Sequence, residues 1–317
     1  MNIMDFTENH IEEAQALAKS NYEEERQLVP VLPPVAALPD LVSFANNGLG
    51  VVMLESGRMI GFLCCYSPWN NAFGTTKVRG TFSPIHAHGA VYENRELIYK
   101  RLYQAAAEKW VENGILSHAI SLYAHDECAI NSLFVSGFGL RTIDAIRPME
   151  EIKCERMPKL HMYELKPEEK TDILELNNLL ISHLSHSPMF MRFNHFNKES
   201  LKEHLDKEKS RYFTAFQEGK MVAYIKIMDG GENFASYDSS MMNIQGACCL
   251  PEYRGSGVYQ NLLNYLIVAL ASEGYTRLGV DFESFNPTAY GFWLKYFTAY
   301  TNGVVRRIDE QILEAGL

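Results

Sequence analysis

The chain has 317 residues, a formal net charge of −10 at pH 7, 47% hydrophobic residues and 21% charged residues. The composition is typical of a globular protein, and the length predicts two domains that each bury a core. The acidic charge argues against a nucleic-acid partner, because neutralising phosphates requires a surplus of Lys and Arg. It favours a small cationic partner instead.

The start of the chain, MNIMDFTENHIEEAQ, carries acids where a secretory signal has a basic segment, so we expect no cleaved leader. The longest apolar run, residues 265–271, is too short to cross a bilayer, and no membrane partner is expected. Four of the six cysteines are neighbours, Cys64 with Cys65 and Cys248 with Cys249. Neighbouring side chains on a strand point to opposite faces, which excludes ordinary disulfides within each pair and predicts a cytoplasmic protein.

The two halves of the chain repeat one another. The stretch ESGRMIGFLCCY (residues 55–66) matches QEGKMVAYIKIM (residues 217–228), and both are predicted hairpins. Further along, Gly114 corresponds to Gly274 at an offset of 160 (274 − 114), and Ala129 corresponds to Ala289 at the same offset. A constant offset over a helix, a strand and a second helix predicts one fold used twice.

Each half is predicted to contain a helix, a β-meander, a strand, a loop, a long helix, a strand, a short helix and a final strand. The long helices end at Gly114 and Gly274 and bury one apolar stripe each. These stripes are Ile98, Leu102, Ala106 and Trp110, then Leu262, Leu263, Leu266, Ile267 and Leu270. A charged stretch with prolines at both ends predicts a linker at residues 148–159, between domains at 1–147 and 160–317. The predicted fold class is α/β with a mixed sheet.

A glycine loop precedes the second long helix in CLPEYRGSGVYQNLL (residues 249–263). Pro251 ends a strand, and the helix is predicted to begin near Val258. The N–H groups of the first helical turn have no partner within the helix, and the glycines allow close approach, which favours a phosphate or pyrophosphate. A tight turn without a ligand is the alternative. Neither GxxxxGK[ST] nor the dinucleotide pattern GxGxxG is present.

This stretch resembles the acyl-CoA signature of the GNAT superfamily of acyl-CoA-dependent N-acetyltransferases. The later stretch NPTAYGFWLKYF (residues 286–297) is similar to a second motif of that family, with matches at Asn286, Ala289, Phe292, Lys295 and Phe297. The resemblance covers the second half at the level of motifs and, through the repeat, the first half at the level of fold. It implies two tandem GNAT-like domains, each with a mostly antiparallel central sheet flanked by helices.

The resemblance also implies where acetyl-CoA binds. The strand edge through Cys248, Cys249 and Leu250 would bind the pantetheine arm, in a gap where this strand diverges from the one near residues 276–282. Asn286 would lie beside the cofactor, although Asn before Pro is also a good helix N-cap. The backbone N–H groups of the loop would hold the pyrophosphate, namely those of Arg254, Gly255, Ser256, Gly257, Val258 and Tyr259.

Two positions depart from the family pattern. The last Gly or Ala of the loop motif is Tyr259, which adds bulk beside the expected pyrophosphate. The Tyr that many members use to protonate the leaving thiolate is Trp293, which has no ionisable proton. Tyr290 and Tyr296, one helical turn on either side, are candidate replacements, with core packing as the alternative.

Acyl transfer needs an amine with a free lone pair, so a proton acceptor is expected nearby. The candidate bases are Glu283 and Asp281 on the strand before Asn286, and Asp238 in the ASYDSS loop. Residues 182–200, which mix histidines with Met and Phe, are a candidate wall of the acceptor pocket or part of the core. His86 and His88 lie on one strand face without a third ligand, so no metal site is expected.

The first half lacks the glycine loop. At the offset of 160, residues 254–257 correspond to Asn94, Arg95, Glu96 and Leu97, which places an acid where a pyrophosphate would lie. We therefore expect no acyl-CoA site in the first half, which would scaffold the second domain, supply a pocket wall or mediate oligomerisation. A homodimer is compatible with the sequence.

The predicted function is N-acetylation of a small, cationic amine by direct attack on acetyl-CoA, catalysed by residues among Glu283, Tyr290 and Asp238. The alternative is a non-catalytic acyl-CoA sensor or interaction module, which Trp293 and Tyr259 favour. A larger acceptor such as a peptide or aminoacyl-tRNA is disfavoured by the acidic charge.

Overall fold

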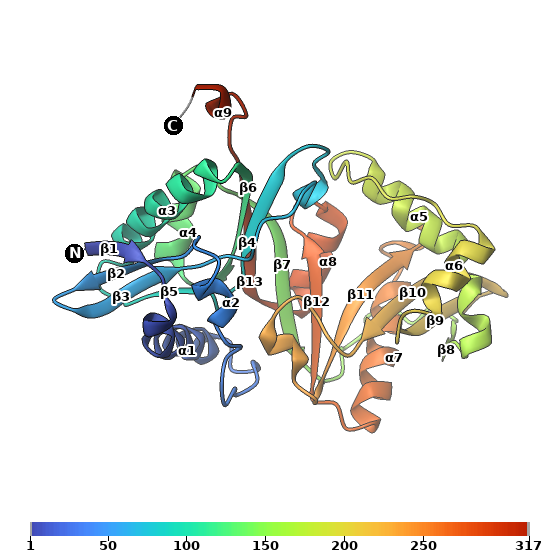
Figure 1. The fold of residues 1–317 in the computed structure, drawn as a ribbon. Helices are drawn as coiled ribbons and strands as arrows, with labels where there is room; N and C mark the ends of the chain where they lie inside the picture. The colour runs from blue at the N-terminus through green and yellow to red at the C-terminus, as the bar shows by residue number, and fades with distance from the viewer. Residues whose placement is uncertain (1, 316–317) are drawn as a thin grey trace. The chain divides into compact units, whose positions relative to one another are not determined.

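A computed structural model describes residues 2–315 of the chain and divides them into two compact units (Figure 1). Unit 1 comprises residues 2–144, 233–235 and 299–315, and unit 2 comprises residues 145–232 and 236–298. The residues that follow 298 therefore belong to the same compact unit as the start of the chain.

Unit 1 contains most of the elements of the first half of the chain. Its elements are β1 (Asn2–Asp5), η1 (Glu8–His10), α1 (Ile11–Leu28), α2 (Val42–Ala45), β2 (Val51–Glu55), β3 (Arg58–Leu63), η2 (Ala72–Gly74), β4 (Arg79–Ser83), β5 (His88–Ala90), α3 (Arg95–Glu112), β6 (Ile115–Tyr123) and α4 (Glu127–Val135). Two late elements join them, β13 (Thr298–Arg307) and α9 (Ile312–Ala315). β7 (Gly139–Pro148) begins in unit 1 and ends in unit 2.

The strands of unit 1 form two sets. The order β1-β2-β3-β5 is antiparallel throughout, and β4 pairs with β6 in parallel while β13 pairs with β6 antiparallel. Val51 and Met53 pack with the buried stripe of α3, whereas Val52 packs with Ala14 and Ala18 of α1. Because alternate residues point to opposite faces, α1 and α3 cover the two faces of the first sheet.

Unit 2 contains the elements of the second half. Its elements are β8 (His161–Glu164), η3 (Pro167–Ile173), α5 (Leu174–Ser185), α6 (Lys198–Leu205), β9 (Arg211–Gln217), β10 (Lys220–Met228), β11 (Met241–Cys249), η5 (Pro251–Tyr253), α7 (Val258–Ser272), β12 (Arg277–Glu283) and α8 (Pro287–Tyr296), while η4 (Phe234–Tyr237) straddles the division between the units. The strand order is β12-β11-β10-β9-β8, antiparallel except for the parallel pair β11 and β12.

Helices α5 and α7 cover opposite faces of the second sheet. Tyr224 of β10 donates a hydrogen bond to Asn177 of α5, while Phe213 of β9 contacts Tyr265 of α7. Tyr224 and Phe213 lie on opposite faces, because Phe213 is the strand partner of Ile225, the next residue after Tyr224. The mixed α/β fold predicted from the sequence is confirmed, with mostly antiparallel sheets flanked by helices in both units.

The apolar stripes predicted for the two long helices are buried in α3 and α7. Gly114 and Gly274 follow these helices with φ of +70° and +96°, the left-handed conformation that suits glycine. Residues 149–160 form no helix or strand, and the linker at 148–159 stays a prediction.

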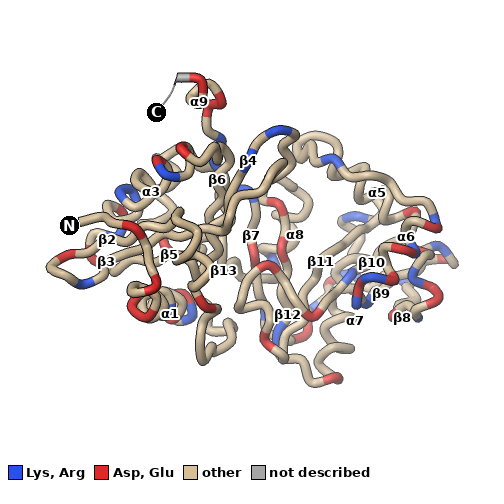
Figure 2. The backbone as a smooth tube through the Cα atoms, in the orientation of Figure 1, with Lys and Arg blue, Asp and Glu red and all other residues tan. Residues whose placement is uncertain are grey.

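Charged residues of both signs are spread along the chain. Figure 2 shows Lys and Arg interspersed with Asp and Glu in both units. Among residues 2–315, no helix combines the length and apolar character needed to cross a membrane.

Candidate functional site

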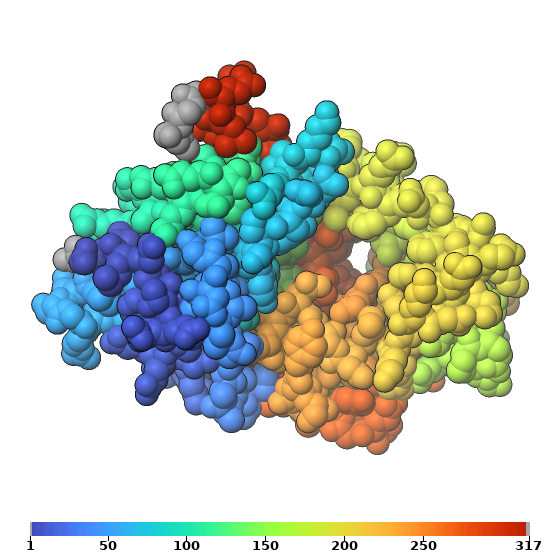
Figure 3. Space-filling view, viewed as in Figure 1, coloured from blue at the N-terminus to red at the C-terminus, as the bar shows by residue number. Residues whose placement is uncertain are grey.

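A cavity of about 540 Å³ lies in unit 2. Its walls come from the end of β11, the glycine loop, α8, the end of α5 and residues 155–156. The space-filling view shows an opening in this region, between yellow residues near α5 and orange residues near β11 (Figure 3). The volume is in the range of ligand-binding pockets.

The glycine loop forms the turn between β11 and α7. Gly255 and Gly257 have φ of +70° and +94°, so both positions need the conformational freedom of glycine. At Gly257 a Cβ atom would approach the Cβ of Arg156 to 2.9 Å and its carbonyl oxygen to 3.1 Å. Gly257 is the residue before α7, and the first N–H groups of that helix begin beside the cavity.

The strand pair beside the loop opens toward the cavity. β11 pairs with β12 only from Met241 to Ile244, opposite Arg277 to Val280. β11 continues to Cys249 paired with β10, while β12 continues to Glu283. The last residues of β11 therefore have an edge that β12 does not cover within the described chain, and this edge lines the cavity at residues 247–249.

Residues 152–156 lie across the start of α7, a feature that the sequence reasoning missed. Arg156 donates a hydrogen bond to the carbonyl of Gly255 at 2.6 Å, and Asn261 of α7 donates to the carbonyl of Arg156 at 2.7 Å. Gln260 donates to Lys153, and the N–H of Ile152 donates to Asn264. Arg156 therefore adds a third cationic side chain to the cavity wall beside Arg254 and Lys295.

Most of the predicted cofactor-binding residues line this cavity. Seven do so, namely Cys248, Cys249, Arg254, Gly255, Gly257, Tyr259 and Asn286. Leu250, Ser256 and Val258 are in the same segment but are not among the lining residues. Leu250 donates its N–H to the carbonyl of Val222 on β10, and Val258, the first residue of α7, is buried.

The predicted catalytic residues lie elsewhere in unit 2, and their roles stay predictions. Glu283 ends β12, Tyr290 is 44% exposed on α8, and neither is among the residues lining the cavity. Asp238 accepts hydrogen bonds from Ser240, which together with the nearby Arg277 lower the pKa of this carboxyl. Tyr296, the other candidate for the missing acid, does line the cavity.

His183 of α5, which lies in the segment predicted to be a wall of the acceptor pocket or part of the core, lines the cavity. Its Nε2 lies 3.4 Å from Asn286 Oδ1 and 3.3 Å from Thr288 Oγ1. Because an amide oxygen only accepts, the contact with Asn286 requires the hydrogen on Nε2, and Nδ1 is then the nitrogen that can accept a proton. Asn286 also caps α8 by accepting from the N–H of Ala289 at 3.4 Å, so it orients His183 as well as the helix.

The two cysteines of β11 are protonated at neutral pH. Burial raises the pKa of Cys248 to about 12 and that of Cys249 to about 11. Neither thiol is therefore available as a nucleophile, since the thiolate is the reactive form. All six cysteines of the chain are free.

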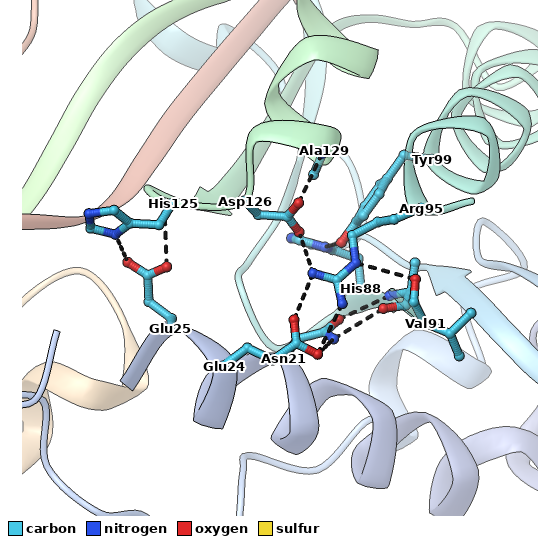
Figure 4. Close-up of polar contacts among 11 residues, drawn as sticks. Asn21, Glu24, Glu25, His88, Val91, Arg95, Tyr99, His125, Asp126 and Ala129 are labelled. Atoms are coloured by element: carbon cyan, nitrogen blue, oxygen red, sulfur yellow. Dashed lines mark hydrogen bonds and ion pairs between the residues drawn. The ribbon is translucent and has the colours of Figure 1, made fainter. Parts of the chain in front are cut away.

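Unit 1 has no glycine loop, and a polar network occupies the equivalent place (Figure 4). Helix α3 begins at Arg95, which corresponds to Gly255 at the offset of 160, so α3 is longer at its start than α7. Arg95 is 5% exposed and forms ion pairs with Glu24 of α1 at 2.8 Å and with Asp126 at 3.2 Å. Asp126 corresponds to Asn286 and likewise caps its helix, through the N–H of Ala129.

Replacing Arg95 by Met is expected to lower the free energy of unfolding by about 3 kcal/mol, because it leaves the buried Asp126 carboxyl unpaired. Burial raises the pKa of Asp126 and Arg95 opposes that shift, so the carboxylate depends on this partner. Denaturant unfolding measures the effect. Adding Asp126→Asn, the residue type at Asn286, should restore part of the loss; a loss below about 1 kcal/mol in the single variant would contradict the assignment.

A sequence profile of the acetyltransferase (GNAT) family matches residues 179–297. No curated protein matches the chain in sequence. Within residues 2–315, no group of three His, Cys, Asp or Glu side chains is arranged to hold a metal ion.

Two solved structures share the fold over nearly the whole chain. A GCN5-related N-acetyltransferase from Sphaerobacter thermophilus is 10% identical with a TM-score of 0.57, over 96% of this chain and 95% of that one. A GCN5-related glucosamine N-acetyltransferase region of a fungal multi-domain GH3 β-N-acetylglucosaminidase is 13% identical with a TM-score of 0.51, over 96% of this chain and 38% of that one. The glycine loop, β11 and α8 all fall inside residues 179–297, the segment that the acetyltransferase (GNAT) family profile matches, and this match supports acyl transfer by that segment.

Proposed function

We propose that unit 2 transfers the acetyl group of acetyl-CoA to the amine of a small acceptor. The observation that carries this proposal is the cavity itself, which joins the start of α7 to the uncovered edge of β11. The start of α7 can bind a pyrophosphate, and the uncovered edge of β11 can bind an extended pantetheine arm. Unit 1 is proposed to bind no acyl-CoA, because Arg95 and its partners occupy the equivalent place.

The residues present fit such a cosubstrate. Gly255 has open space beside it, whereas at Gly257 the absence of a side chain makes room for Arg156. Arg254, Arg156 and Lys295 supply positive charge to a cavity whose wall contains one acid, Glu155. Phosphate groups are therefore favoured at the loop, and the uncovered N–H groups of β11 would bind amide carbonyls.

We propose His183 as the group that takes the proton of the attacking amine. An alkylamine with a pKa of about 10.4 is neutral in only about one molecule in 2,500 at pH 7, so a proton acceptor is needed. Attack of the amine nitrogen on the acetyl carbonyl forms the amide bond and breaks the carbon–sulfur bond. His183 takes the amine proton, and the thiolate leaves and takes a proton from solvent. The high pKa of Cys248 and Cys249 supports direct attack over an acyl-cysteine intermediate.

The acceptor is proposed to be a small and cationic amine, in keeping with the net charge of −10. Polyamines, amino sugars and amino acid derivatives are the classes to test. A cytoplasmic location is proposed from the free cysteines.

The first experiment is calorimetric titration of acetyl-CoA, followed by thiol release with a panel of these amines. We expect one acetyl-CoA bound per chain and amine-dependent release of thiol. Replacing His183 by Gln should lower kcat at least about tenfold with little change in acetyl-CoA affinity. Binding without thiol release would indicate the non-catalytic sensor, and binding of two acetyl-CoA molecules would contradict the assignment of unit 1.

A further inference from the structure

Tyr259 carries a buried hydroxyl group without a hydrogen-bond partner among the described residues. The residue is the second of α7 and lines the cavity. Its ring contacts Phe292 and Trp293 of α8 edge-on, with ring centroids 4.9 and 5.9 Å away. An unpaired buried hydroxyl is unfavourable in a protein, so this one points to a partner that binds in the cavity.

The surroundings of the hydroxyl indicate which end of the cavity it faces. Burial raises the pKa of Tyr259 well above its usual range, and the nearby thiols of Cys249 and Cys248 add to the shift. The phenol is therefore protonated at neutral pH and has a hydrogen to donate. Cys248 and Cys249 are the last residues of β11, and no cation of the glycine loop contributes to the pKa shift, which is consistent with a hydroxyl near the strand edge.

In unit 1 the tyrosine hydroxyl at the equivalent position has a side-chain hydrogen-bond partner. Tyr99 corresponds to Tyr259 at the offset of 160 (259 − 99), and its hydroxyl lies 2.8 Å from Nδ1 of His88. His88 corresponds to Cys248, and its Nε2 lies 2.6 Å from the carbonyl oxygen of Ser121 on β6. The imidazole thus bridges β5 and β6, and Nε2 must donate because a carbonyl only accepts.

In unit 2 the bridging imidazole is replaced by the short side chain of Cys248, and the gap between β11 and β12 is open to the cavity. We infer that the Tyr259 hydroxyl donates a hydrogen bond to an acceptor atom in the pantetheine arm of the bound acyl-CoA. The ligand would then take the place that the His88 ring fills in unit 1. This inference rests on the proposed function, and it makes Tyr259 a cosubstrate-binding residue through its side chain.

Tyr259→Phe is the direct test, because it removes one oxygen atom and keeps the ring contacts. We expect CoA to bind about tenfold more weakly than to the wild type, as loss of a buried hydrogen bond predicts. Binding of 3′-phosphoadenosine 5′-diphosphate, which has the phosphates but no pantetheine arm, should not change. The ligand-free variant should melt about 2–4 °C higher, since it no longer buries an unpaired hydroxyl.

Tyr99→Phe is the matched control, because this hydroxyl already has a partner in His88. It should lower the melting temperature and leave CoA binding unchanged. Wild-type affinity for CoA in Tyr259→Phe would overturn the inference while the proposed function stands. Equal weakening for CoA and the nucleotide would place the hydroxyl at the phosphates and also overturn it. If wild-type protein binds no CoA, both the inference and the proposed function fail.

Discussion

Gly291→Trp is expected to weaken acetyl-CoA binding at least about 100-fold, because the new side chain occupies part of the cavity. Gly291 lies within α8 and lines the cavity, and a Cβ atom built on it meets no atom within 4 Å. An indole there extends into open space and leaves the core of unit 2 intact. Isothermal titration of wild type and variant measures the loss, and unchanged far-ultraviolet circular dichroism would show that the fold is retained.

Gly291→Ala is the matched control for this experiment. Its methyl group is small enough to leave the cavity open, and Ala is favoured over Gly inside a helix by about 1 kcal/mol. We expect a small gain in stability and near wild-type affinity for acetyl-CoA. Full affinity in Gly291→Trp would show that the cosubstrate binds outside this cavity.

The stability of unit 1 is expected to fall steeply as the pH drops from 7 to 5. Burial lowers the pKa of His86, His88 and His118 to about 4. In the unfolded chain these histidines have a pKa near 6.5. Between pH 6.5 and pH 4 the unfolded state therefore binds more protons than the folded state, and the free energy of unfolding falls as the pH falls. Each histidine should cost about 2 kcal/mol of folding free energy at pH 5 relative to pH 7.

Two buried carboxyl groups oppose the effect of the histidines on the pH dependence of stability. Burial raises the pKa of Glu25 and Asp126, so these groups bind protons more readily in the folded state and offset part of the loss near pH 4–5. Denaturant unfolding at several pH values tests the net effect. In His118→Gln the free energy of unfolding should depend less steeply on pH, by up to about 1.4 kcal/mol per pH unit. A wild-type free energy of unfolding that is equal at pH 7 and pH 5 would contradict the prediction.

The features set by local sequence were predictable. The leucine stripe and Gly274 specify α7, and the Asn-Pro pair at Asn286 specifies the start of α8, because caps and apolar periodicity act over a few residues. The glycine loop could also be predicted from the sequence, because its positive φ angles favour glycine at Gly255 and Gly257.

The features that depend on distant residues were not predictable. Nothing in the sequence near Arg156 indicates that it lies over Gly257, about 100 positions away (257 − 156 = 101). His183 meets Asn286 only because α5 and α8 border the same cavity. Glu283 and Asp281 are candidates because they lie close to Asn286 along the chain, whereas the direction in which a side chain leaves the end of a strand is set by packing.

The pairing of β13 with β6 has a consequence for synthesis of the chain. Thr301 lies opposite Tyr123, so the two partners are separated by 178 positions (301 − 123). While the ribosome is making the intervening residues, one edge of β6 has exposed N–H and carbonyl groups that can recruit a foreign strand. Unit 1 therefore cannot complete its sheet until the residues after 298 have been made, although most of its residues precede those of unit 2.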